Sequence, residues 1–135
     1  MFSPKGISEI VLVVKDVGRA AAFYQEVVGL KVDQRVDENW CWLWAGAPGA
    51  PQRIGLTTGP LSYGAEHIRG PMHFALRLEP EELPAAMAHL RAKGIEIEGP
   101  VRFEDWDARS IYFDDLDGNR VEFCALPVPQ PSRVA

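Results

Sequence analysis

Two carboxylates and one imidazole stand at matching places in the sequence, and such side chains can hold a divalent metal or move a proton. Glu9 lies in the first β-branched run, His73 at the start of a second run, and Glu122 in the last one. Because side chains alternate along a strand, all three project from the face opposite the apolar one. A carboxylate shielded from water is costly unless it is paired or bound to a cation. Glu9, His73 and Glu122 are therefore candidate metal ligands, and Glu9 and Glu122 are also candidate catalytic residues.

Each of these residues also has a simpler interpretation. Glu122 could pair with Arg120 or Arg109, and Glu9 could pair with an arginine in a pocket that holds no metal. His73 could be a histidine satisfied within the core. These alternatives stay open at the level of the sequence.

The elements that must position these residues occur twice along the chain. The first half predicts a helix between Asp16 and Gly29, with strands at 7–14, 30–36, 40–45 and 53–58. The second half predicts a helix between Pro80 and Gly94, with strands at 72–78, 95–97, 101–103, 110–113 and 120–125. Apart from the division of one strand into 95–97 and 101–103, the second half repeats the order of the first: strand, helix, strand, strand, strand.

The two halves align with an offset of about 65 residues. Glu9 then corresponds to His73, and Gly55 corresponds to Glu122. Because Gly55 has no side chain, three protein ligands and one open coordination position are expected. So small a unit does not cover its sheet alone, so the two modules must pair, either within one chain or between two chains.

Length, charge and composition limit which classes of protein this chain can belong to. The chain has 135 residues, 14 basic and 19 acidic side chains and a net charge of −5, which excludes a broad nucleic-acid surface. Its longest aliphatic run, 10–14, is too short to span a bilayer, and Cys41 and Cys124 make no disulfide framework. We expect one cytoplasmic domain over 1–126, with modules at about 6–58 and 72–126, a linker at 59–71 and a loose tail at 127–135. Exposed sheet edges favour a homodimer.

One strand carries three alternating tryptophans, Trp40, Trp42 and Trp44, which must share a face. They either fill the space between sheet and helix or line an aromatic pocket. The sequence leaves the choice open, and Trp42 and Trp44 are candidate substrate-binding residues.

Several segments resemble one known superfamily. They are 8–12, 15–16, 23–24 and 29–30 in the first half and 72–76 in the second. They also include the closing motif Tyr-Phe-x-Asp-x-Asp-Gly-Asn-x-x-Glu over 112–122. Together they resemble the glyoxalase/bleomycin resistance/extradiol dioxygenase superfamily, also called the vicinal oxygen chelate superfamily. The resemblance covers the whole chain except the tail.

That resemblance implies an α+β fold in which two βαβββ modules form a half-barrel around a metal. Its ligand positions fall on Glu9, Gly55, His73 and Glu122, and Ser110 and Tyr112 would approach the cavity as substrate-binding residues. The first position is commonly His in such families and is Glu here. The resulting Glu-His-Glu set favours Mn²⁺, Mg²⁺ or Zn²⁺ over a tuned Fe²⁺ site, with Ni²⁺ and Fe²⁺ left open.

Two functions follow as expectations. The first is a metal-dependent enzyme that chelates two adjacent oxygens of a small oxygen-rich substrate and acts as a lyase, isomerase, thiol transferase or dioxygenase. The second is a drug-binding protein of the bleomycin resistance type, without metal or catalysis. Four tryptophans and the charge of −5 suit the second.

Overall fold

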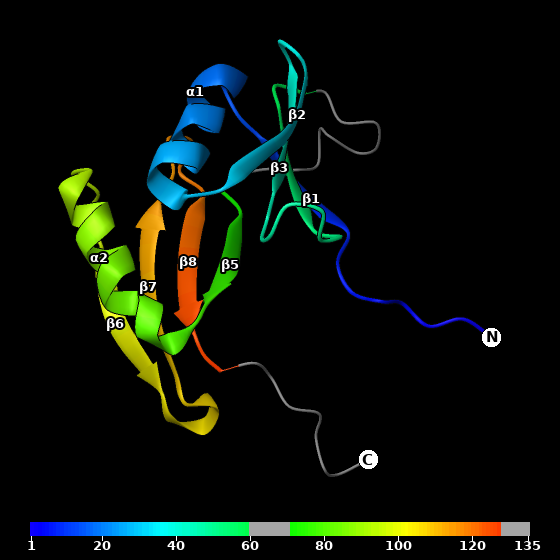
Figure 1. The fold of residues 1–135 in the computed structure, drawn as a ribbon. Helices are drawn as coiled ribbons and strands as arrows, with labels where there is room; N and C mark the ends of the chain where they lie inside the picture. Colours follow the sequence, from blue (N-terminus) through cyan, green and yellow to red (C-terminus); the bar gives the residue numbers. More distant parts are fainter. Residues whose placement is uncertain (60–70, 128–135) are drawn as a thin grey trace. The chain divides into compact units, whose positions relative to one another are not determined.

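The structure, a computed structural model, describes residues 1–59 and 71–127 (Figure 1). Of the predicted linker, 60–70 lie outside the described residues, as do 128–135 of the predicted tail. The chain divides into two compact units. Unit 1 contains residues 1–72 and 115–118, and unit 2 contains residues 73–114 and those from 119 onward.

Unit 1 is a four-stranded sheet with one helix. Its strand order is β1-β4-β3-β2. β1 runs parallel to β4, and the other pairs are antiparallel. The bounds are β1 Glu9–Val13, β2 Lys31–Asp37, β3 Trp40–Trp44, β4 Arg53–Thr57 and α1 Val17–Phe23. A π-helical turn, Tyr24–Val28, replaces the last part of the predicted regular helix.

The helical segment made of α1 and the π-helical turn begins and ends where the sequence predicts. The Asp16 carboxylate accepts a hydrogen bond from the backbone N–H of Arg19 at 2.9 Å, and Gly29 ends the helical segment with φ +90°. The buried side of α1 contacts β3 and β4. The sheet face that packs against α1 is therefore core, and the opposite face is available to form a site.

The end of the α1 segment is tied to residues 115–118 of the same unit. The buried Tyr24 hydroxyl donates to Asp115 Oδ2 at 2.6 Å, and Asp117 Oδ1 accepts from the Lys15 backbone N–H at 2.9 Å. Burial, followed by the nearby Asp115 carboxylate, raises the pKa of Tyr24 well above its usual range. The phenol is therefore a structural donor.

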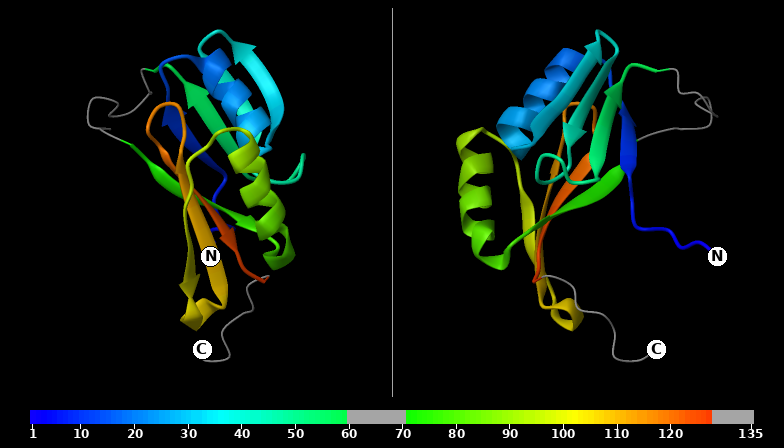
Figure 2. Two further views of the ribbon diagram at one scale, coloured as in Figure 1. Left: turned by 90° about the vertical axis from the view of Figure 1, so that its left-hand side faces the viewer. Right: turned by 45° about the vertical axis from the view of Figure 1, so that its right-hand side comes forward.

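Unit 2 repeats the same topology with the order β5-β8-β7-β6. Its elements are β5 His73–Leu78, α2 Leu83–Ala92, β6 Glu98–Phe103, β7 Ala108–Asp114 and β8 Arg120–Ala125. A 3₁₀ turn, Pro80–Glu82, leads into α2. Figure 2 shows α2 lying along one face of this sheet, where Leu83 and Leu90 are buried.

The prediction of two separate strands at 95–97 and 101–103 is wrong. A single strand, β6, covers 98–103, and 95–97 lies outside any strand. The backbone N–H of Ile95 instead bonds to the Leu90 carbonyl at 2.9 Å, closing the end of α2 after Gly94. The Ile95 N–H is therefore not available for a strand ladder.

Both units are thus βαβββ modules, which confirms the predicted α+β fold of two modules. In each, the apolar strand face lies under the helix and a more polar face is left on the other side. The half-barrel implied by the resemblance, like the predicted extent of a single domain, stays a prediction. None of the helices within 1–59 and 71–127 has the length and apolar character needed to span a bilayer.

Candidate functional site

His73 and Glu122 form the central contact of unit 2. His73 lies on the edge strand β5, and Glu122 lies on the neighbouring parallel strand β8. Imidazole Nε2 is 3.2 Å from Glu122 Oε1, and Nδ1 is 3.1 Å from the Arg120 carbonyl oxygen. Because a carbonyl oxygen only accepts, this contact assigns the proton to Nδ1 as donor. Nε2 is therefore the nitrogen that faces the carboxylate.

This geometry suits a proton or a cation at Nε2. A neutral imidazole would point its lone pair at the Glu122 carboxylate, whose side chain is only 12% exposed. A second proton or a cation removes that repulsion. Two ligand atoms on one metal, each at 2.0–2.2 Å, lie roughly 3.0 to 3.4 Å apart, and 3.2 Å falls in that interval. A ligand histidine commonly donates its other N–H to a backbone carbonyl. The pair therefore fits two adjacent coordination positions.

Two other predicted residues share this sheet face. Tyr112 lies opposite Glu122 in the β7–β8 register, and Ser110 lies opposite Cys124. Burial, followed by the Glu122 charge, raises the pKa of the Tyr112 phenol. The Ser110 hydroxyl is fully buried beside the Tyr112 phenol, whose pKa it lowers in part. Hydroxyl donors thus flank the carboxylate along β7.

Arg120 is not the partner of Glu122. Its guanidinium group pairs with Glu98 through a short contact and with Asp114 at 3.7 Å, and it lies 5.2 Å from the centre of the Tyr112 ring. The carboxylate of Glu122 is directed instead at His73. The simpler interpretation, in which Arg120 neutralises Glu122, is therefore wrong.

The tryptophans of β3 lie on the sheet face away from α1. Cys41 and Leu43, which alternate with them, are fully buried on the helix side. Trp40, Trp42 and Trp44 are half-buried on the opposite face, so they do not fill the space between sheet and helix. The structure thereby excludes the first of the two alternatives, and an aromatic pocket at these tryptophans stays a prediction.

Gly55 lies beneath two of these indoles. A Cβ at this position would stand 2.7 Å from Trp42 Cζ3 and 3.1 Å from Trp40 Cζ3. The two rings stack with centroids 5.3 Å apart and planes 28° from parallel. The space that a side chain at Gly55 would need is therefore filled by indole. The open coordination position expected from the missing side chain of Gly55 stays a prediction.

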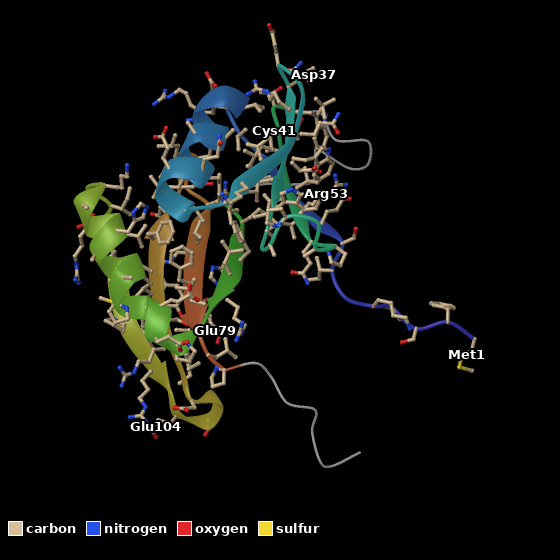
Figure 3. All side chains as sticks on the ribbon, in the orientation of Figure 1. Met1, Asp37, Cys41, Arg53, Glu79 and Glu104 are labelled. Carbon is tan, nitrogen blue, oxygen red and sulfur yellow. The ribbon has the colours of Figure 1, made fainter. Side chains whose placement is uncertain are left out.

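Arg53 extends the aromatic stack. Its guanidinium carbon lies 4.4 Å from the Trp42 ring centre, and Nη1 is 3.0 Å from Asp33 Oδ2 (Arg53 is labelled in Figure 3). Glu9 is the register neighbour of Arg53 across β1 and β4 and is exposed. The carboxylate that binds Arg53 is thus Asp33, and Glu9 is left for another role.

The structure groups the predicted residues by unit. His73, Glu122, Tyr112 and Ser110 share one face of unit 2, and Glu9, Gly55, Trp42 and Trp44 share one face of unit 1. Within the described ranges, no three His, Cys, Asp or Glu side chains lie close enough to hold a metal together. Of the three predicted ligands, only His73 and Glu122 are in contact.

Sequence reasoning missed Arg53 and Asp33. Alternation along β4 would have placed Arg53 on the same face as Gly55, beside the tryptophans. Nothing in the sequence marks Asp33, because its contact depends on which strands are neighbours in the sheet. The ion pair joins residues from β2 and β4, which are separated by β3.

Comparison with known proteins gives one family and many similar folds. A family sequence model described as Glyoxalase/Bleomycin resistance protein/Dioxygenase superfamily matches residues 6–123. An integron cassette protein from the mobile metagenome of the Halifax Harbour sewage outfall is 29% identical with a TM-score of 0.74, and the match covers 91% of this chain and 100% of that one.

Two further structures show the same fold at lower identity. TnmS3, an antibiotic-binding protein from Streptomyces sp. CB03234, is 22% identical over 94% of this chain and 100% of its own, with a TM-score of 0.72. A variant of the fosfomycin resistance protein FosX from Listeria monocytogenes, solved with Mn(II) and a dihydroxypropylphosphonic acid, is 24% identical. That match covers 93% of this chain and 94% of FosX, with a TM-score of 0.70.

Proposed function

This chain belongs to the glyoxalase/bleomycin resistance protein/dioxygenase superfamily, and from that premise we propose that it is a metal-dependent enzyme acting on a small, oxygen-rich substrate. His73 and Glu122 would hold a divalent cation, and substitution tests Glu9, the third ligand predicted from the sequence. The observation that carries the proposal is the 3.2 Å approach of His73 Nε2 to Glu122 Oε1, with Nδ1 donating to a backbone carbonyl.

A cation at this place would act as a Lewis acid toward two adjacent substrate oxygens and stabilise negative charge as it develops. The chain's own residues have separate tasks. The Arg120 carbonyl holds the His73 ring in the tautomer that presents Nε2. The part-buried Tyr112 hydroxyl would donate a hydrogen bond to a substrate oxygen on this face.

The two carboxylates would divide the work by their surroundings. Glu122 is largely buried against His73 and suits a permanent ligand. Glu9 is exposed, and Asp33 rather than Glu9 binds the neighbouring Arg53. Glu9 would therefore be the ligand that can exchange and accept a proton from the substrate.

Metal analysis tests this proposal. We expect about one equivalent of divalent metal per chain after dialysis against Mn²⁺, Mg²⁺, Zn²⁺, Ni²⁺ or Fe²⁺, for at least one of the five. Glu122→Gln should lose it, because a neutral amide replaces a buried anionic ligand. The matched control is Glu96→Gln, an exposed carboxylate of the same unit, which should keep it. A wild-type protein that binds none of these metals would contradict the proposal.

The second candidate is a metal-free protein that sequesters an aromatic ligand. The half-buried stack of Trp40, Trp42 and Arg53 favours it, because a planar ring can stack on exposed indole. Titration with bleomycin in EDTA, followed by tryptophan fluorescence, separates the two functions. Quenching that persists in EDTA supports sequestration, and its absence together with bound metal supports the enzyme. The homodimer and the cytoplasmic location stay predictions.

A further inference from the structure

A pocket of about 520 Å³ lies on the helix side of unit 2, lined by α2, β6 and β7. It is on the opposite sheet face from His73 and Glu122, because Arg109 pairs with Ala125 in the register whereas Tyr112 pairs with Glu122. Its apolar wall includes Leu83, Met87 and Pro100. All of its lining residues are described and belong to unit 2.

Three arginines concentrate positive charge in this pocket. Arg102 and Arg109 lie directly opposite each other on β6 and β7, and Arg91 comes from the last turn of α2. Like charges at directly opposite strand positions destabilise a sheet. Asp107 is the one carboxylate in the lining, so the positive groups outnumber it.

The guanidinium groups of these three arginines make no ion pair or hydrogen bond with another described residue. Two other arginines of the chain behave differently. Arg53 pairs with Asp33, and Arg120 pairs with Glu98. In a chain with a net charge of −5, carboxylates are abundant, yet they do not neutralise this group. These three arginines thus line a space that an anion can enter, and no described carboxylate pairs with their guanidinium groups.

We propose that this arginine pocket, defined by Arg91, Arg102 and Arg109, binds a small organic anion. A carboxylate or phosphate group lies between Arg102 and Arg109, because a guanidinium group presents paired donors that match two oxygens. The apolar body of the ligand lies on Leu83 and Met87. The volume is in the range of pockets that hold small molecules. The site is independent of the proposed metal pair.

Titration of the full chain with four probes tests the proposal. Benzoate, phenyl phosphate, inorganic phosphate and the neutral analogue benzyl alcohol are added at low salt, and backbone amide shifts are followed by ¹H–¹⁵N NMR. The two aromatic anions should shift amides of α2, β6 and β7, and added sodium chloride should weaken them. Inorganic phosphate should bind more weakly because it has no apolar body, and benzyl alcohol should not bind. The ratio of benzoate to phenyl phosphate affinity identifies which anionic group the pocket prefers.

Charge-matched variants separate the pocket from a general electrostatic effect. Arg109→Gln and Arg102→Gln should each weaken binding about tenfold or more, the loss expected for a hydrogen bond to a charged group. Lys93→Gln removes the same charge just after α2, outside the lining, and should change affinity less than about twofold. Without ligand, the melting temperatures of the two arginine variants should be no lower than that of the wild type. Each substitution removes the repulsion between Arg102 and Arg109.

Three results would overturn the proposal. The first is equal binding of benzyl alcohol and benzoate, which would remove the role of the charge. The second is an equal loss in Lys93→Gln and Arg109→Gln. The third is shifts confined to the His73 face of the sheet, which would place the anion elsewhere.

Discussion

The two modules place the same supporting contacts around different central residues. In unit 1, Arg53 of β4 lies over Trp42 of β3 and pairs with Asp33 of β2. In unit 2, Arg120 of β8 lies over Tyr112 of β7 and pairs with Glu98 of β6. Each arginine thus lies on an aromatic ring of the next strand and pairs with an acid of the outer strand.

The modules differ at the position two residues after this arginine, on β4 in unit 1 and on β8 in unit 2. Gly55 follows Arg53 and is covered by indole, whereas Glu122 follows Arg120 and contacts His73. The repeated arginine contacts therefore belong to the scaffold. The modules differ in whether the position two residues later carries a side chain: Gly55 faces Trp42, and Glu122 faces Tyr112.

The largest expected effect comes from making unit 1 resemble unit 2 at this position. Gly55→Glu should lower the free energy of unfolding by about 3 kcal/mol, because the new side chain overlaps the Trp42 ring. Urea unfolding measures it. Gly46→Glu, at a glycine with open space around its Cβ position, is the control and should change little. Adding Trp42→Ala to Gly55→Glu should cost less than the sum of the two single changes; strict additivity would show that the overlap is not the cause.

The second effect concerns the helical segments. Unit 1 buries the Tyr24 hydroxyl against Asp115, whereas the corresponding part of α2 buries the apolar Leu90. Tyr24→Phe should cost about 2 kcal/mol, because Asp115 loses a buried donor. Leu90→Met, which keeps volume and adds no polar group, should cost less than about 1.5 kcal/mol. Urea unfolding near neutral pH compares them, and a larger cost for Leu90→Met would reverse the comparison.

The same tyrosine gives a pH dependence. Its folded pKa lies above its unfolded pKa of about 10, so the stabilisation is complete below pH 10 and decreases as the pH rises beyond it. Unfolding of the wild type should therefore become steeply easier above pH 10. Tyr24→Phe should show a shallower decline in the same range, and parallel curves would exclude Tyr24 as the cause.

The third effect tests the repeated arginine contacts. Arg53→Gln should lower the free energy of unfolding by about 0.5–1 kcal/mol, through loss of the contact with Trp42 and the pair with Asp33. In unit 2, Arg120 holds the pKa of the Glu98 carboxyl below its usual range, so Arg120→Gln should raise that pKa toward the ordinary value. Carboxyl NMR titration measures it. The stabilisation from this pair is present above the ordinary pKa and is lost as the pH falls through the lowered one. An unchanged titration would show that the pair does not form in solution.

The smallest expected effect on stability is that of Glu9→Gln, because Glu9 is exposed and its neighbour Arg53 is bound elsewhere. The change should stay within about 0.5 kcal/mol. The same variant should weaken metal binding if Glu9 is a ligand, so unfolding and metal content are measured together. Loss of metal at full stability would support the proposed third ligand, and full metal retention would remove Glu9 from the set.

The sequence predicted the modules well because their boundaries depend on local chemistry. Asp16 caps α1, Gly29 and Gly94 end the helical segments in the left-handed conformation, and β8 covers the predicted 120–125. Such features depend only on residues that are close together in the sequence. The same holds for the face shared by Tyr112 and Glu122, which follows from alternation.

The features that sequence did not predict depend on which strands are neighbours. The indoles over Gly55 require the β3–β4 register, and the arginine pocket requires Arg102 and Arg109 to face each other across β6 and β7. The choice of face for the tryptophans required knowing that Cys41 and Leu43 lie under α1. Residue types are visible in the sequence, but pairing across strands is not.

The glycine beneath the indoles also limits how this protein can change. A chain that acquired histidine or glutamate at Gly55 while keeping Trp42 would first have to survive a crowded and weakened sheet. In the reverse order, a smaller residue replaces Trp42 before Gly55 changes. This opens the space beside Gly55 but removes the stacking of Trp42 on Trp40. A metal-ligating residue at position 55 therefore requires at least two substitutions, with the one at position 42 first. Libraries of single substitutions should contain no stable variant of this kind.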